Sequence, residues 1–160
     1  MIGFLKPSSF EACSPRAFSL PMPSFLTRRI SFAAAHRYRR PDWSPERNAE
    51  VFGLCAREHF HGHTYVCTVT VSGDIDATTG MVIDLARLDR VLNSEVRDRF
   101  DHRNINLEVP EFAEGKRIPT GEELAKFIYD RVQSGLGSAA RVVEVTVAED
   151  DTLSASYRAD

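Results

Sequence analysis

The sequence Cys55-Ala56-Arg57-Glu58-His59-Phe60-His61-Gly62-His63 places one thiol and three imidazoles within nine residues. It continues into Thr64-Tyr65-Val66-Cys67-Thr68-Val69-Thr70-Val71, whose β-branched and aromatic residues predict a strand. Side chains two apart in a strand share a face, so His61 and His63 would continue the apolar row that begins at Tyr65. Two imidazoles on one face can both bind one zinc ion. A structural or surface role is the usual alternative for a single histidine, so a third ligand is needed.

A candidate for that third ligand ends an earlier strand. From Leu26 onward, Ile30, Phe32, Ala34 and His36 share one parity, which predicts a strand whose apolar face ends in an imidazole. A core histidine bonded to a backbone carbonyl is the alternative. The residues that follow, 37–45, predict a polar loop, whose arginines could meet phosphate or remain exposed to solvent.

Composition sets the broad class of the protein. The chain has 160 residues, 42% of them hydrophobic and 27% charged, which is typical of one globular domain. A net charge of -3 and the lack of a basic block argue against a nucleic-acid partner, and no apolar run reaches the roughly 18–20 residues of a membrane span. Cys13, Cys55 and Cys67 form neither a disulfide framework nor a metal knuckle, which favours a reducing cytoplasm.

The order of predicted elements indicates an α+β fold. Residues 1–25 lack a clear period and predict a flexible extension before a domain of residues 26–160, with an organelle transit segment as the alternative. Periodicity and turn residues then predict a turn at 72–80, a short return strand at 81–84, a helix of roughly four turns over 85–100, a loop at 107–119, a helix from Thr120 to about Gly135, and strands at 142–149 and 153–157. The two helices should cover one face of an antiparallel sheet.

Two polar features of this pattern call for partners. Glu149 continues the inward row of the strand at 142–149, and an unpaired buried carboxylate is costly, so it should reach solvent or a partner. Asp101 and His102 lie together at the end of the first helix, where simple capping is one explanation.

Taken together, these stretches resemble the 6-pyruvoyl-tetrahydropterin synthase family, which includes the 6-carboxytetrahydropterin synthases. The resemblance runs from about Ile30 to Tyr157. Its motifs, in order, are Phe32-Ala33-Ala34-Ala35-His36, Phe52-Gly53-Leu54-Cys55, His61-Gly62-His63, Gly80-Met81-Val82-Ile83-Asp84, Asp101-His102-Arg103-Asn104, Pro119-Thr120-Gly121-Glu122 and Val147-Ala148-Glu149.

The resemblance implies a set of roles. It assigns His36, His61 and His63 to Zn2+, Cys55 to the catalytic base, and Asp101 with His102 to its acid/base partner. It assigns Glu149 to the pterin edge, with Thr120 and Glu122 nearby. A cysteine beside zinc and an imidazolium should have a lowered pKa. The implied fold is the tunnelling fold (T-fold), in which sheets join into a barrel in a homohexamer, a dimer of trimers with sites at subunit interfaces. The implied substrate is 7,8-dihydroneopterin triphosphate.

Several alternatives stay open at this point. The five-residue gap between Cys55 and His61 favours the pyruvoyl reaction, which releases triphosphate, over the carboxy reaction of queuosine-type synthesis, which also releases acetaldehyde. A zinc or pterin-binding module without turnover is a further alternative. His59 shares the parity of His61 and could compete as a ligand, although the family pattern argues against it. The resemblance does not assign the residues that bind the triphosphate; the candidates are Arg37, Arg39, Arg40, Lys116 and Arg117.

Overall fold

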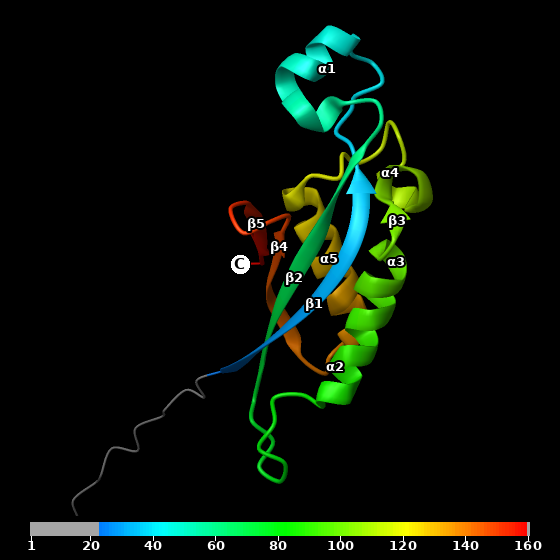
Figure 1. Ribbon diagram of the computed structural model, residues 1–160. Helices are drawn as coiled ribbons and strands as arrows, with labels where there is room; N and C mark the ends of the chain where they lie inside the picture. The colour runs from blue at the N-terminus through cyan, green and yellow to red at the C-terminus, as the bar shows by residue number, and fades with distance from the viewer. Residues whose placement is uncertain (1–22, 160) are drawn as a thin grey trace, which may run out of the picture.

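Two long strands form the centre of the sheet. In the computed structural model, which describes residues 23–159, β1 and β2 pair along their full length and three shorter strands flank them (Figure 1). The strand order is β3-β1-β2-β4-β5. The bounds are β1 Ser24–His36, β2 His61–Gly73, β3 Arg103–Asn104, β4 Arg141–Ala148 and β5 Ser154–Arg158.

The alternation predicted for β1 and β2 is confirmed. Every second side chain from Ile30 to His36 in β1 is buried, as is every second one from Tyr65 to Val71 in β2. The antiparallel register puts His36 opposite His61 and Ala34 opposite His63. The predicted histidines therefore lie at one end of the face that carries the hydrophobic core.

Two helical segments cover that face (Figure 1). The first runs through α2 (Leu85–Leu92), a π-helical turn (Asn93–Arg97) and α3 (Asp98–Phe100), as the spacing over 85–100 predicts. The second is α5 (Gly121–Leu136), which buries Leu124, Phe127, Ile128 and Val132. The Thr120 side chain accepts a hydrogen bond from the Glu123 N–H, and the helix ends at Gly137 with φ of 58°, a value that favours glycine.

Three local predictions are wrong. Residues 81–84 form no strand, because Asp84 instead caps α2 by accepting from the Ala86 N–H. The predicted loop at 107–119 contains the end of a short helix, α4 (Ile105–Glu108), and a 3₁₀ turn (Pro110–Phe112). The sheet is not wholly antiparallel, since β3 pairs parallel to β1. Helix α1 (Pro45–Phe52) and a 3₁₀ turn (Gly53–Ala56) follow the loop after β1.

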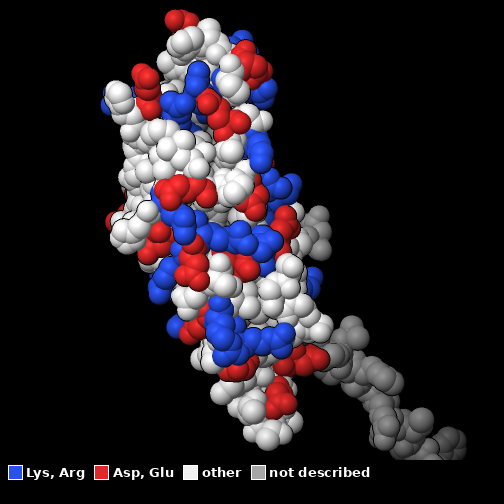
Figure 2. All heavy atoms as spheres, turned by 90° about the vertical axis from the view of Figure 1, so that its right-hand side faces the viewer, with Lys and Arg blue, Asp and Glu red and all other residues white. Residues whose placement is uncertain are grey.

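The chain termini and surface complete the fold. Strand β1 begins at Ser24, just before the predicted boundary at Leu26, and the rest of the predicted extension, residues 1–22, lies outside the described residues. Among residues 23–159, no helix is long and apolar enough to cross a membrane. On the face formed by the α2–α3 helix, basic and acidic side chains are interspersed and form no continuous basic patch (Figure 2).

Candidate active site

Three imidazoles meet where β1 ends and β2 begins. One ring nitrogen from each of His36, His61 and His63 lies within 4.8 Å of the other two. The Nε2 atoms of His36 and His61 are 3.1 Å apart. His59 is exposed and is not part of this cluster, so the parity argument that made it a competitor does not hold in the structure. The strand register thus brings together the three histidines that the sequence singles out.

His36 is prepared to act as a neutral ligand. Its side chain is fully buried, and its Nδ1 lies 3.0 Å from the carbonyl oxygen of Pro119. Because a carbonyl only accepts hydrogen bonds, Nδ1 carries the proton and the Nε2 lone pair faces the cluster. Burial lowers the pKa of His36 to about 4; the bond to Pro119 opposes this shift and the other two imidazoles add to it. The ring is therefore uncharged at neutral pH, as metal binding requires.

The cluster also holds a buried atom without a partner. His63 Nε2 is buried and has no hydrogen-bond partner among the described residues. Buried polar atoms are normally paired, so this nitrogen points to a missing ligand. Three imidazole nitrogens that converge in this way fit a zinc ion with an open coordination position, and these side chains can hold a metal ion.

Cys55 lies on the 3₁₀ turn after α1, and its carbonyl accepts a 2.8 Å hydrogen bond from the Tyr38 N–H. The thiol is half-buried. Burial, and then the negative charge of Glu149, raise the pKa of Cys55 above its ordinary value. The lowering expected from the sequence depends on a bound zinc ion. This shift comes from the protein groups alone, so the lowering stays a prediction for the zinc-bound site.

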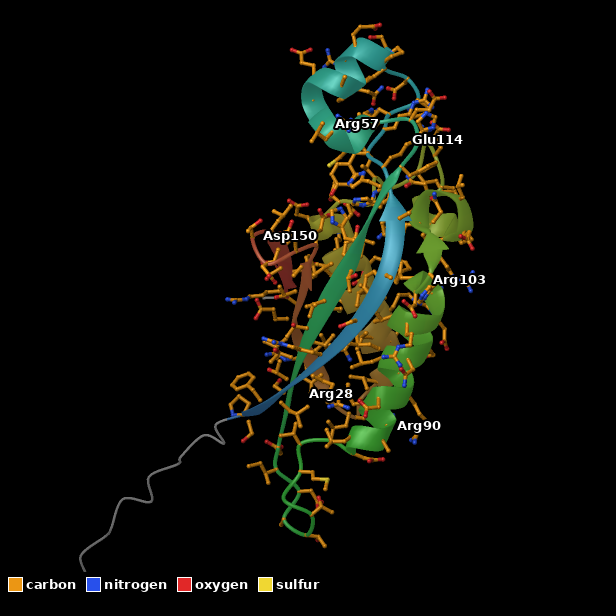
Figure 3. All side chains as sticks on the ribbon, in the orientation of Figure 1. Arg28, Arg57, Arg90, Arg103, Glu114 and Asp150 are labelled. Carbon is orange, nitrogen blue, oxygen red and sulfur yellow. The ribbon has the colours of Figure 1, made fainter. Side chains whose placement is uncertain are left out.

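Glu149 follows the last residue of β4 and is only 6% exposed. Its Oε1 accepts a 2.9 Å hydrogen bond from the Tyr38 hydroxyl, and its Oε2 lies 3.8 Å from His63 Nε2. The sequence predicts that this carboxylate has a partner or reaches solvent, and the partner is Tyr38. Glu149 also borders a pocket of about 310 Å³ that Thr120 and Glu122 line. Figure 3 labels the neighbouring Asp150 on the turn between β4 and β5.

Asp101 and His102 lie beside β1, directly before the short strand β3. An Asp101 oxygen accepts from the Ala33 N–H at 2.8 Å, and the other lies 3.1 Å from His102 Nδ1. The Ala33 bond is the main reason why the pKa of Asp101 is lowered. The His102 side chain is 83% exposed. Among residues 23–159, neither Asp101 nor His102 makes a hydrogen bond or ion pair with Cys55, although His102 borders a shallow pocket together with His63.

The basic candidates for triphosphate binding already have partners. Arg37 and Arg39 both contact Glu114, and Arg40 pairs with Asp42. Figure 3 labels Glu114, the carboxylate that Arg37 and Arg39 share. Lys116 donates to the Pro110 carbonyl, and Arg117 lies 3.9 Å from Glu123. Because each of these five basic residues has a partner, the contacts do not favour any one of them as the triphosphate ligand.

Sequence reasoning missed Tyr38 and the Pro119 carbonyl. Tyr38 lies in the segment that the sequence predicts to be a polar loop. Only its position two residues after His36 indicates a role, because it keeps the parity of the inward row. A backbone carbonyl has no residue signature at all. Both groups act on site residues that the sequence does identify.

A sheet whose two longest strands meet at a three-histidine cluster that could hold a metal ion, beside a small pocket with a buried carboxylate, is the arrangement of a T-fold protein. The chain matches the family model described as 6-pyruvoyl tetrahydropterin synthase over residues 25–160. It is 38% identical over 135 residues to the 6-pyruvoyl tetrahydrobiopterin synthase of Drosophila melanogaster, covering 84% of this chain and 79% of that protein.

Further comparisons agree. The human 6-pyruvoyl tetrahydrobiopterin synthase is 37% identical over 135 residues, which cover 84% of this chain and 91% of the human protein. The structure of 6-pyruvoyl tetrahydropterin synthase from Caenorhabditis elegans superposes with a TM-score of 0.81 at 32% identity, covering 87% of this chain and 97% of that one. The chain belongs to the 6-pyruvoyl tetrahydropterin synthase family.

Proposed function

We propose that this chain is a zinc-dependent lyase that converts 7,8-dihydroneopterin triphosphate to 6-pyruvoyl-tetrahydropterin and releases triphosphate. The observation that carries the proposal is the convergence of His36, His61 and His63 beside Cys55 and the buried Glu149 in a member of this family. When bound, zinc would act as a Lewis acid and make the side-chain hydroxyls of the substrate more acidic.

The protein groups divide the remaining work. Glu149 would accept two parallel hydrogen bonds from the amino-pyrimidinone edge of the pterin, which offsets the cost of burying its charge. Thr120 and Glu122 line the same pocket. Cys55, as the thiolate, would remove a proton from a side-chain carbon of the substrate. Protons are then redistributed along the side chain, and the carbon–oxygen bond to triphosphate breaks.

Asp101 and His102 would return the proton, with Asp101 orienting the imidazole. Because the pair makes no hydrogen bond or ion pair with Cys55 among residues 23–159, we propose that it acts on the site of a neighbouring subunit in a homohexamer built as a dimer of trimers. A cytoplasmic location suits this chemistry, since a reducing compartment keeps the Cys55 thiol from oxidation.

The test is incubation of zinc-loaded protein with 7,8-dihydroneopterin triphosphate, with products identified by mass spectrometry and no reductase added. A 6-pyruvoyl product with free triphosphate supports the proposal. A 6-carboxy product with acetaldehyde would move the chain to the carboxy reaction, and binding without turnover would make it a binding module.

Matched variants test the roles of single residues. Cys55→Ala should abolish product while zinc content stays at the wild-type value, and Cys67→Ala, which changes a buried thiol within the core, should keep turnover. His61→Ala should lose zinc by elemental analysis, whereas His59→Ala should not, because His59 lies outside the cluster. Full zinc content in His61→Ala would refute the ligand set.

A further inference from the structure

Tyr38 contacts three parts of the site at once. Its backbone N–H donates to the Cys55 carbonyl at 2.8 Å. Its ring packs edge-on against His36, with centroids 5.0 Å apart, and against Phe52 at 6.0 Å. Its hydroxyl donates to Glu149 Oε1 at 2.9 Å. A rigid ring fixed at both ends therefore delivers one hydrogen bond to the buried carboxylate.

We propose that Tyr38 is a positioning residue that orients the Glu149 carboxylate to recognise a ligand with two adjacent N–H donors. The inference rests on the proposed function, because it concerns the pterin-binding role given there to Glu149. It adds a residue that acts through Glu149 and sets which ring edge the pocket accepts.

The surroundings of Glu149 explain why it needs such a partner. At 6% exposure, the carboxylate has little access to water that could hold its plane. Its second oxygen lies 3.8 Å from His63 Nε2, so a carboxylate free to rotate can turn toward the metal cluster instead of the pocket. The Tyr38 hydroxyl holds Oε1 in place on the pocket side.

The hydrogen-bond capacity of the carboxylate leaves room for a ligand. Each carboxylate oxygen has about two acceptor positions, and Tyr38 uses one of those on Oε1. The remaining positions can accept two parallel N–H donors from one planar ring, the pattern of an amino-pyrimidinone. A ring with a carbonyl in place of the amino group would set an oxygen against the carboxylate. The pocket should therefore prefer 2-amino pterins to 2-oxo lumazines.

The experiment measures equilibrium binding to zinc-loaded protein, with 7,8-dihydroneopterin and the corresponding 7,8-dihydrolumazine as probes. Both lack the triphosphate leaving group, so binding is observed without elimination. Tyr38→Phe keeps the ring and removes only the hydroxyl. It should weaken binding of the pterin by about tenfold or more, the usual effect of losing a hydrogen bond to a charged group, and binding of the lumazine by less than about twofold.

Tyr129→Phe is the matched control. The Tyr129 hydroxyl also donates a single 2.9 Å hydrogen bond, to the Val142 carbonyl, and it is not among the residues of the pocket. This variant should bind both probes as the wild type does. In turnover assays, Tyr38→Phe should raise KM for the pterin triphosphate by the same factor as the binding loss and leave kcat within about twofold. Zinc content should stay close to that of the wild type, and the melting temperature should fall by a few degrees because the buried Glu149 carboxylate loses its partner.

The outcomes separate the inference from the proposed function. If Tyr38→Phe binds the pterin as tightly as the wild type, or weakens both probes equally, the inference is overturned while the lyase activity stands. If the wild type binds the pterin selectively without turnover, the lyase proposal fails and the role of Tyr38 holds. Failure of the wild type to bind the pterin overturns both. In a Glu149→Gln background, Tyr38→Phe should cause no further loss, and an independent loss would also refute the positioning role.

Discussion

Acidification should destabilise the metal-free protein through His36. Burial holds the pKa of this imidazole at about 4, whereas the ordinary value is 6.5. Between these values the unfolded chain binds a proton that the folded chain does not, so stability is complete above pH 6.5 and falls as the pH drops toward 4. From linkage, the loss between pH 7 and pH 5 is about 2 kcal/mol for this residue.

The assay is urea unfolding of EDTA-treated protein at pH 7 and pH 5, for the wild type, His36→Gln and His59→Gln. Carboxylates elsewhere contribute equally to all three proteins, so the difference between variants isolates the imidazole. His59→Gln should lose as much stability as the wild type, because His59 is exposed. His36→Gln should lose about 2 kcal/mol less. Equal losses in the three proteins would show that His36 is protonated as readily in the folded state, and the account of a neutral preformed ligand would be wrong.

Three other perturbations test the fold and the metal site. Asp84→Ala removes the acceptor for the Ala86 N–H and should cost about 1 kcal/mol in thermal unfolding; an unchanged melting temperature would contradict the capping role. Glu95→Gln should cost roughly 1–2 kcal/mol at pH 7 by urea unfolding, because Glu95 accepts from Arg131 and Arg99. Burial raises the pKa of Glu95, but the bonds to the two arginines together lower it below its ordinary value of 4.5, so the cost should shrink as the pH falls below that value. EDTA should lower the melting temperature of the zinc-loaded wild type and added zinc should restore it, whereas an identical melting temperature with and without zinc would mean that the folded state does not bind the metal preferentially.

The strands and their facing residues could be predicted because one physical rule governs both. Alternation along β1 and β2 reflects burial on one side of a sheet, so it also places the imidazoles of His36, His61 and His63 on that side. The same rule says nothing about residues between elements. Helix α1 has a sequence signal, Ser44 as N-cap and Pro45 in the first turn, but its exposed surface gives it no strong apolar period.

Contacts across the chain set the limit of sequence reasoning at the site. The sequence shows that Asp101 and His102 are neighbours, but not that Asp101 accepts a hydrogen bond from the Ala33 N–H and so lies beside β1. It shows that Glu149 needs a partner, but not that this partner is the tyrosine 111 residues earlier. Such pairings depend on how the strands curve and end. No local pattern encodes that geometry.

Burial links the stability of this fold to its proposed chemistry. The inward row of β1 ends in His36 because the apolar face continues to the last residue of the strand. Desolvation there favours the neutral imidazole, and the Pro119 carbonyl fixes the proton on Nδ1, so the lone pair of Nε2 is directed into the cluster. Burial also raises the pKa of Cys55, and the negative charge of Glu149 adds to this rise. If Cys55 is the base of the proposed lyase, a zinc ion nearby would oppose both effects, so zinc binding and formation of the thiolate would be coupled.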